Sequence, residues 1–245
     1  MQIDILPTAQ AAETYDFKGC EAVVIDVLRA TSVMTMALAN GAEAILPVAS
    51  VDEAFASAER LGREMVILGG ERNADRIEGF DLGNSPQDYT HARIGGKTVV
   101  LTTTNGTLAM RNAASADGVI AASMLNRLAV VRLLANAAAG SRVVIVCSGN
   151  YGLPTLEDCL CAALLAKGAE DAGLRVTYAS DYAICVRMMA EAYERDDGLR
   201  WFANSRHYNR LIAKGYAADV EVCLRHDGSV SAVPRLMADG FVRMA

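Results

Sequence analysis

The sequence predicts a layered α/β/α fold, in which a largely parallel or mixed sheet is built from repeated strand-turn-helix units. Short apolar strands alternate along the chain with alanine-rich helical segments, which is the pattern of an α/β protein. Apolar residues make up 52% of the 245 residues and aromatic residues only 6%. A core of small aliphatic side chains suits helices that pack on a buried sheet. We therefore interpret residues 1–245 as a single α/β domain, with two intertwined similar halves as a variant of that arrangement.

The first unit begins with the apolar run at residues 23–26, which leads through a polar turn into a helix at about 32–40. A short strand is expected at 44–48. A capping box, Ser50 with Glu53, then opens a helix that extends to about residue 63.

The second unit matches the first, element for element. A strand at 98–101 leads to a polar turn at 102–107 and a helix that ends near residue 114. A short strand at 118–121 and a helix over about 123–136 follow. The turn at 102–107 therefore occupies the position that Asp26 to Ser32 occupies in the first unit.

A third copy of the first half has a strand at 142–147, a turn at 148–154 and a helix at 155–170. A further strand is expected at 66–68, directly before Gly69-Gly70-Glu71-Arg72.

The remaining segments are less regular. Residues 79–86 have the composition of a loop. A charged helix is expected near 186–196, and residues 218–224 are interpreted as an edge strand.

Three polar turns are expected to meet in one crevice, because ligands of such sheets bind where the carboxyl ends of the strands gather. These turns follow Ile25, Leu101 and Val146, and the turn after Leu68 is a fourth candidate.

Charge and targeting signals exclude several partners. The net charge is −6 and no basic run stands out, which argues against nucleic acid or an anionic membrane as a partner. Neither a signal peptide nor an apolar segment of membrane-spanning length is present, so we expect a cytoplasmic protein. The six cysteines lack paired spacing and are interpreted as reduced thiols.

The turn after the first strand combines Asp26, Arg29, Thr31 and Ser32 at the start of a helix. Helix amides, hydroxyl groups and a guanidinium favour an anion, and a carboxylate beside an anion calls for a cation between them. The structural alternative is that Asp26 caps the helix and pairs with Arg29. A second acid and arginine at Glu71-Arg72 favours the functional interpretation.

The threonine-rich turn at 102–107 has four hydroxyl groups in six residues, whereas an ordinary helix cap needs one. Thr104, Asn105 and Gly106 can form a nest of amides around an anion. Glu157 and Asp158 lie in the first turn of a later helix. There the acids either interact favourably with the positive end of the helix dipole or coordinate a divalent cation.

Other catalytic groups have weaker support. His91, His207 and His226 are far apart and lack metal-ligand spacing, although His207 has polar neighbours on both sides. Cys147 is interpreted as a packed thiol, since no arginine follows at the distance that a cysteine phosphatase loop requires. Nucleotide-binding glycine motifs are absent.

The predicted strand ends bring together oxygen ligands that suit Mg²⁺ rather than Zn²⁺. The acids are Asp26, Glu71, Asp81, Glu157 and Asp158. Together with Arg29 and Arg72 they resemble the equipment of phosphoryl transfer, in which charge neutralisation and positioning dominate catalysis.

Several long motifs occur in one order along the chain and resemble the 2-phosphosulfolactate phosphatase family. They lie at residues 24–32, 39–42, 69–72, 79–86, 103–107 and 156–158, and Ser205, His207, Gly215 and Val233-Pro234 fit as well. The resemblance implies an α/β fold peculiar to the family. It also implies Mg²⁺-dependent hydrolysis of 2-phospho-3-sulfolactate to 3-sulfolactate and phosphate, a step toward coenzyme M in methanogens.

On this resemblance we assign roles as hypotheses. Asp26, Arg29 and Asp158 are the expected catalytic residues. Asp26 and Asp158, with Glu71 third, are the expected metal ligands. Substrate-binding roles are expected for Thr31, Ser32, Arg72, Asn84, Ser85, Thr104, Asn105 and Gly106. The nucleophile is either activated water or Asp26 itself.

Two other functions stay open from sequence. One is a phosphatase for another small phosphorylated 2-hydroxy acid, and the other is a non-catalytic protein that binds an anionic metabolite. The apolar helices permit a homodimer without requiring one.

Overall fold

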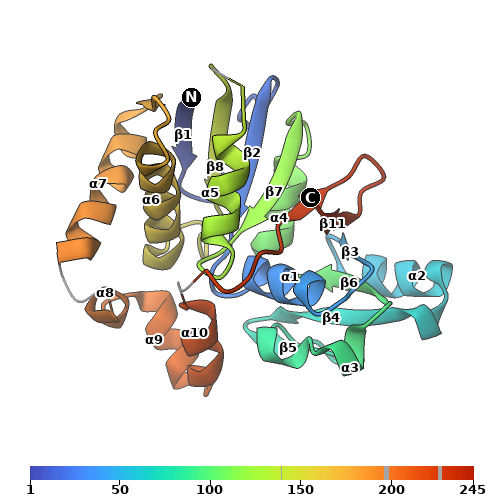
Figure 1. The fold of residues 1–245 in the computed structure, drawn as a ribbon. Coiled ribbons are helices and arrows are strands. Elements are labelled where there is room, and N and C mark those ends of the chain that lie inside the picture. Colours follow the sequence, from blue (N-terminus) through green and yellow to red (C-terminus); the bar gives the residue numbers. More distant parts are fainter. Residues whose placement is uncertain (139, 196–198, 226–227) are drawn as a thin grey trace.

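The computed structural model describes residues 1–138, 140–195, 199–225 and 228–245. Within these residues, eleven strands form one mixed sheet flanked by helices (Figure 1). The α/β fold class predicted from the sequence is confirmed. From one edge to the other the strands are β5 (Asp75–Arg76), β4 (Val66–Arg72), β6 (Thr98–Thr102), β3 (Ala44–Pro47), β11 (Val242–Met244), β10 (Pro234–Leu236), β7 (Gly118–Ala122), β2 (Cys20–Ile25), β8 (Arg142–Cys147), β1 (Gln2–Leu6) and β9 (Thr177–Tyr178).

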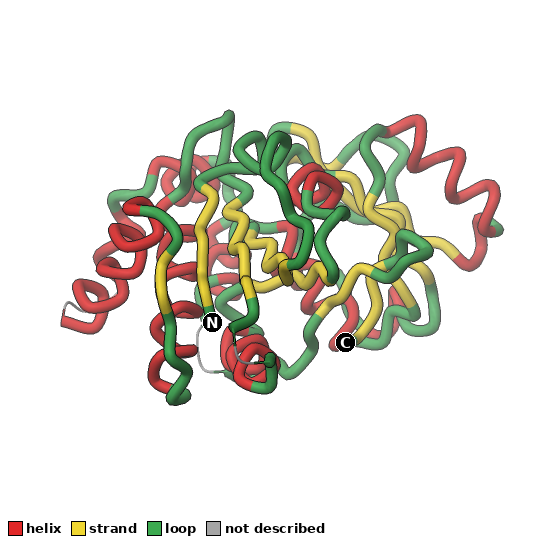
Figure 2. Tube along the Cα trace, turned by 90° about the horizontal axis from the view of Figure 1, so that it is seen from above, coloured by secondary structure: helices red, strands yellow, loops and turns green. Residues whose placement is uncertain are grey.

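Helices pack on both faces of the sheet, and Figure 2 shows the strands as a twisted band with helices on either side. The α-helices are α1 (Ala30–Ala39), α2 (Val51–Leu61), α3 (His91–Ile94), α4 (Gly106–Asn112), α5 (Arg127–Ala135), α6 (Leu156–Asp171), α7 (Asp181–Arg195), α8 (Leu199–Ala203), α9 (Arg206–Ala213) and α10 (Ala217–Cys223). Two short 3₁₀ turns lie at Arg63–Met65 and Pro86–Asp88.

The sheet consists of two parallel sets of strands joined by an antiparallel hairpin, with the short β5 added antiparallel to β4 at one edge. Strands β4, β6 and β3 form the smaller set, and β7, β2, β8, β1 and β9 form the larger. The hairpin β10–β11 lies between them, where β10 pairs with β7 and β11 pairs with β3. The unit β2–α1–β3 starts in the larger set and ends in the smaller, and β6–α4–β7 runs the other way.

Alternation along β2 shows how both faces become buried, because successive side chains of a strand point to opposite faces. Val23 and Ile25 pack with residues of α5, α6 and α7, whereas Ala22 and Val24 pack with residues of α1 and α4. All four side chains are fully buried. The apolar run in the sequence therefore reflects a strand covered on both faces.

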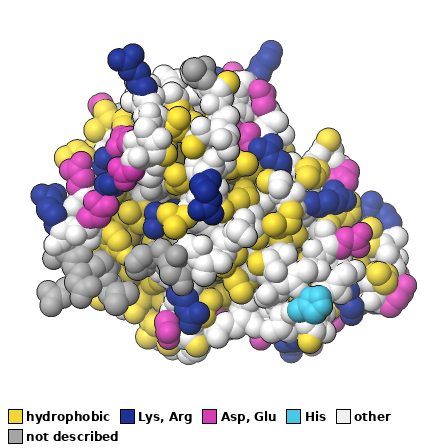
Figure 3. Space-filling model, viewed as in Figure 1, with side chains coloured by type: hydrophobic (Ala, Val, Ile, Leu, Met, Phe, Trp, Pro, Cys, Tyr) yellow, Lys and Arg dark blue, Asp and Glu magenta, His cyan; other side chains and the backbone are white. Residues whose placement is uncertain are grey.

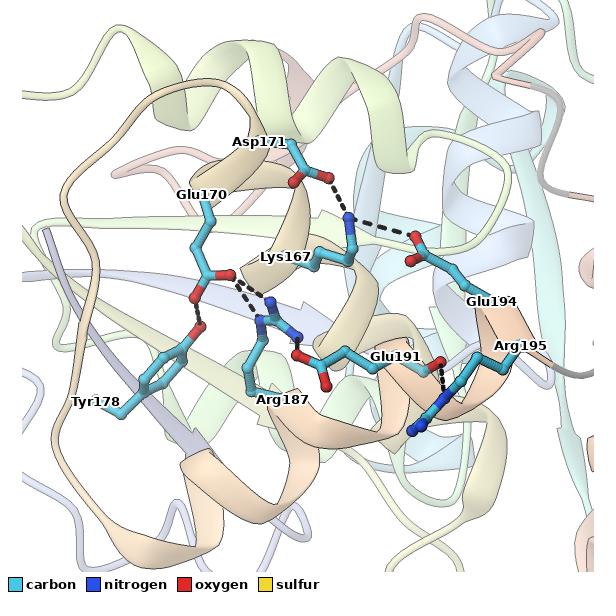
Figure 4. A network of polar contacts seen from close by, with 8 residues as sticks. All are labelled: Lys167, Glu170, Asp171, Tyr178, Arg187, Glu191, Glu194 and Arg195. Atoms are coloured by element: carbon cyan, nitrogen blue, oxygen red, sulfur yellow. Dashed lines mark hydrogen bonds and ion pairs between the residues drawn. The ribbon is translucent and has the colours of Figure 1, made fainter.

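Helices α6 and α7 pack side by side at one end of the molecule and are joined by a polar network (Figure 4). At its centre, the carboxylate of Glu170 accepts hydrogen bonds from Tyr178 and Arg187. Burial raises the pKa of Glu170, but Arg187 and Tyr178 lower it by more, so the pKa lies below its usual range.

Several elements differ from the sequence expectation. Residues 218–224, expected as an edge strand, belong to helix α10 and its end. The buried side chains there, Val220, Cys223 and Leu224, have the spacing of one helix face rather than the alternation of a strand. Helix α7 begins earlier than expected, and its expected end at Asp196 lies outside the described residues.

The strands β1, β10 and β11 carried no recognised signal in the sequence. The two strands of the hairpin are each three residues long, too short for a periodic pattern. In the described part of the chain, no helix combines the length and apolarity needed to cross a membrane. On the face that Figure 3 shows, basic side chains are scattered among acidic and apolar ones.

Candidate functional site

A cavity, called here the strand-end cavity, lies where four strands reach their carboxyl ends. The convergence predicted for three polar turns is confirmed, and the fourth candidate, at the end of β4, joins them. These turns supply Asp26, Leu28 and Arg29 after β2, Glu71, Asn73 and Ala74 at the end of β4, Thr104 and Asn105 after β6, and Asn150 and Tyr151 after β8. Asn84 and three residues of α9, His207, Arg210 and Leu211, complete the lining.

Asp26 lines this cavity directly after β2. Its Oδ1 accepts a hydrogen bond at 3.1 Å from the backbone N–H of Ala30, the first residue of α1, whose N-cap position is Arg29. Burial raises the pKa of Asp26 to about 6, against the lowering effect of the Ala30 amide and the positive charge of His207. The neighbouring carboxylates of Glu71 and Glu157 raise this pKa further.

Gly106 lets the start of α4 approach Asp26. A Cβ atom at this position would lie 2.7 Å from Oδ2 of Asp26 and 2.4 Å from Cβ of Ala30. The two similar units of the chain therefore meet here, first turn against first turn, with space for glycine only.

Glu71 connects the ends of β4 and β6. Its Oε1 accepts hydrogen bonds from the backbone N–H and the hydroxyl of Thr104, at 2.8 and 2.9 Å, and its Oε2 accepts from the N–H of Ala74 at 2.8 Å. Part of the donor set that the sequence assigned to a bound anion is thus engaged by the protein's own carboxylate. Thr104 and Asn105 nevertheless line the cavity, as expected for that turn.

Arg29 is placed differently from the oxyanion-holding role expected of it. Its guanidinium donates to Asp219 of α10 at 2.5 Å and to the carbonyl of Ala74 at 2.6 Å, and it stacks on Tyr216 at 4.2 Å. Only 2% of the side chain is exposed. The positive charge of Arg29 is therefore compensated by Asp219 inside the protein, although Arg29 also lines the cavity.

Thr31 and Ser32, expected to bind substrate, donate their hydroxyls to the carbonyls of Asp26 and Val27, at 2.8 Å each. Both are fully buried and shape the turn from within. The same hydroxyl bracing occurs in the second unit, where Thr107 donates to the carbonyl of Thr103 at 2.9 Å.

Asp158, expected as a metal ligand, also has a structural position. Its two oxygens accept from the backbone N–H groups of Val27 and Gly149, at 2.8 and 3.1 Å, and it does not line the cavity. Burial, with Asp26 and Glu157 nearby, raises its pKa well above the usual range. A carboxylate whose oxygens both hold backbone amides ties two turns together.

The other predicted residues divide between the cavity and its surroundings. Asn84 lines the cavity, and its buried Oδ1 has no hydrogen-bond partner within the described structure. Ser85 donates to Asp219 at 2.6 Å in an adjoining hollow. Arg72 donates to the carbonyl of Glu71 and the hydroxyl of Thr102, and it lies outside the cavity lining.

Sequence reasoning missed the contribution of helix α9. Nδ1 of His207 lies 2.8 Å from Oε1 of Glu157, a fully buried residue of α6. Arg210 lines the same cavity and stacks on Tyr151 at 4.9 Å. The sequence signals for His207 were its polar neighbours and its fit to the family motifs. Neither indicated its partner, which lies 50 residues away. His226 lies outside the described residues.

Cys147 takes no part in the cavity. It is fully buried at the end of β8, where interaction with the Cys159 thiol and burial raise its pKa well above the usual range. A thiol of this kind is inert as a nucleophile, in agreement with the packed role expected for it.

The oxygen atoms that line the cavity could hold a metal ion only in part. Across the described residues, no three of the His, Cys, Asp and Glu side chains come together closely enough to hold a metal ion unaided. The cavity does offer two carboxylates, Asp26 and Glu71, together with the unpartnered Oδ1 of Asn84. This set fits Mg²⁺, which is commonly held by one or two carboxylates and completes its shell with water and substrate phosphate.

Comparison with known families gives a match along almost the whole chain. The sequence profile described as 2-phosphosulpholactate phosphatase matches residues 6–239. The chain belongs to this family.

Curated relatives from bacteria agree with that assignment. A protein of Clostridium perfringens (strain SM101 / Type A) is 40% identical over 227 residues, which cover 91% of this chain and 89% of the relative. A protein of Caldanaerobacter subterraneus subsp. tengcongensis is 38% identical over 242 residues, covering 96% and 97%. One from Thermotoga petrophila is 40% identical over 223 residues, covering 90% and 91%. Each carries the name "Probable 2-phosphosulfolactate phosphatase".

The family assignment gives the strand-end cavity its chemical context. The family motifs at residues 24–32, 69–72 and 103–107 contribute its acids and its threonine turn. The motif at 156–158 lies behind it, where Glu157 and Asp158 bind groups of the surrounding turns.

Proposed function

We propose that this protein hydrolyses 2-phospho-3-sulfolactate to 3-sulfolactate and phosphate in a Mg²⁺-dependent reaction at the strand-end cavity. Membership of the family and the names of the curated relatives support this substrate. The observation that carries the proposal is the composition of the cavity. Two carboxylates for a hard cation, Asp26 and Glu71, share one cavity with the cationic side chain of Arg210.

Asp26, Glu71 and the Oδ1 of Asn84 are the proposed ligands of Mg²⁺. Bound there, the cation would neutralise charge on the phosphate group. Asp158 is left out of this ligand set, because it does not line the cavity, whereas Glu71 does.

Arg210 is the residue proposed to bind the anionic groups of the substrate. Among the described residues that line the cavity, Arg210 carries a guanidinium without a carboxylate partner, whereas Arg29 pairs with Asp219. The substrate has a phosphate, a sulfonate and a carboxylate. A bound Mg²⁺ would neutralise the phosphate group, so a further positive group would be needed for the sulfonate and the carboxylate. The planar guanidinium of Arg210 suits such oxyanions.

The test measures phosphate release from a panel of phosphorylated 2-hydroxy acids, with Mg²⁺ and with a chelator. We expect the highest kcat/KM for phosphosulfolactate and loss of turnover with the chelator. A preference for phospholactate or phosphoglycerate would favour a different small substrate. Binding of the panel without phosphate release would favour a non-catalytic metabolite-binding protein.

The matched variants are Asp26→Asn and Asp171→Asn. Asp26→Asn should reduce phosphate release at least about 10³-fold, since it removes a carboxylate from the reacting centre. Asp171, on the outer end of α6, is exposed and should be replaceable without effect. Equal activity of the two variants would show that Asp26 takes no part in the reaction.

A further inference from the structure

His207 of the strand-end cavity contacts a buried acid, Glu157, which does not itself line the cavity. The side chain of Glu157 is fully buried and accepts a hydrogen bond at 2.8 Å from the hydroxyl of Ser205. Ser205 is the donor in this bond because an ionised carboxylate only accepts, and the Ser205 oxygen itself accepts from the backbone N–H of Tyr208 at 3.1 Å as the cap of α9. Ser205 must therefore donate its proton to Glu157.

The other oxygen of Glu157 faces the imidazole of His207. Nδ1 lies 2.8 Å from Oε1, and in the described structure this ring is the basic group within ion-pair distance of Glu157. A buried carboxylate without a cation is costly, so the pairing favours a proton on Nδ1 and a positive ring. The opposite nitrogen, Nε2, is left for the cavity that His207 lines.

The other polar groups of the cavity are poor proton donors. The guanidinium groups of Arg29 and Arg210 do not deprotonate in proteins. The carboxylates of Asp26 and Glu71 are the proposed ligands of Mg²⁺, and a carboxylate that binds a cation has given up its proton. The Tyr151 hydroxyl donates to Asn73 at 3.2 Å. The imidazole of His207, held by a buried acid, is the remaining group of this lining that can transfer a proton.

Phosphate esters of alcohols need such a donor, because an alkoxide leaves poorly unless it is protonated. We propose that His207 is the general acid of this enzyme and that Glu157 and Ser205 are its positioning residues. The inference rests on the proposed hydrolysis of a phosphate monoester. As the oxygen of the attacking water bonds to phosphorus, the bond from phosphorus to the C2 oxygen breaks. Its electron pair stays on that oxygen, which takes the Nε2 proton. The proton that the water releases passes to solvent, and solvent returns one proton to the neutral ring.

The test compares leaving groups that differ in their need for a proton. His207→Gln should lower kcat/KM for phosphosulfolactate by about 10²–10⁴-fold, the usual range for general acid catalysis. For acetyl phosphate and 4-nitrophenyl phosphate, whose leaving groups depart as stable anions, the loss should stay below about tenfold. Retained turnover of these two esters also shows that the variant is folded.

The positioning role is tested with Glu157→Gln and the control is His91→Gln. Glu157→Gln should show the same selective loss for the alkyl ester, because an amide does not balance a positive ring. His91 is exposed on α3, outside the cavity, and its replacement should change neither class of substrate.

The outcomes separate the two proposals. An equal loss for all leaving groups in His207→Gln would overturn the general acid while leaving the phosphatase activity in place. A wild-type protein that releases phosphate from none of the esters would overturn both. An unchanged leaving-group dependence in Glu157→Gln would overturn the positioning role alone.

Discussion

Two side chains of this protein, Arg29 and His207, have roles that their residue types and sequence neighbours do not indicate. Arg29 is of a residue type that commonly binds anions, yet both terminal nitrogens of its guanidinium donate hydrogen bonds to groups of the protein itself. His207, which lacks metal-ligand spacing in the sequence, lines the cavity and is held by a buried acid. Partners distant in sequence decide the role of each, because a charge inside the protein needs compensation nearby.

Arg29→Met should destabilise the protein by about 3–5 kcal/mol, because it leaves Asp219 buried without its cation. The double variant Arg29→Met/Asp219→Leu should recover part of this loss, since no charge then remains unpaired. Denaturant unfolding of the wild type, both single variants and the double variant measures the coupling. Simple additivity of the two changes would contradict the pairing.

At the scale of elements, the decisive feature is the meeting of α1 and α4 at their first turns. Each helix follows a strand of a different parallel set, and the Thr31 and Thr107 hydroxyls brace the two turns alike. The repeat in the sequence is thus visible as a repeated local structure. The contact that the two turns make with one another was not predictable from the repeat.

Gly106→Ala should lower kcat by about 10²-fold, because the added Cβ displaces the Asp26 carboxylate from its position. Stability should fall by about 1–3 kcal/mol from the same overpacking. Gly83→Ala is the control, since its Cβ would meet Arg76 Cβ at an ordinary 3.5 Å. Turnover and thermal unfolding of both variants provide the measurement, and similar behaviour of the two would contradict the steric argument.

The contact between α6 and α7 gives a prediction on pH. The pKa of Glu170 is lowered in the folded protein, so its contribution to stability is present above the unfolded pKa and is lost as pH falls through the folded value. Arg187→Met should therefore cost about 0.5–1 kcal/mol at pH 7, and the difference from wild type should shrink below about pH 4.

Arg195→Met is the matched control for this network (Figure 4). Arg195 donates to the backbone carbonyl of Glu191, which does not titrate, so its effect on unfolding free energy should not vary with pH. A cost of Arg187→Met that is the same at pH 7 and at acid pH would show that Glu170 is not the partner that matters.

At the scale of the whole molecule, the C-terminal hairpin closes the sheet. Strand β10 pairs with β7 of one parallel set and β11 pairs with β3 of the other. Without it, both sets would present unpaired inner edges to solvent. The last residues of the chain therefore join segments that the earlier chain leaves apart.

Val242→Asp should cost about 3 kcal/mol or more, because it buries a charge at the fully buried junction of β11 with β3. Met244→Asp, in the same strand but half exposed, should change stability by about 0.5 kcal/mol or less. Denaturant midpoints measure both, and equal costs would mean that the hairpin does not hold the sheet together.

The sequence by itself determined the strand-turn-helix units, the fold class and the convergence of polar turns, because these follow from local apolar periodicity and from the geometry of parallel strands. It also determined the family, through motifs that are long and ordered.

Only the tertiary structure decided which polar residues face the cavity. Asp158, Thr31 and Ser32 turned toward backbone groups, whereas Asn84 kept a free oxygen in the cavity. Helix α9 brought His207 onto Glu157 across 50 residues. Hydrogen bonding and charge compensation between distant segments are satisfied only after packing, and local sequence carries no record of them.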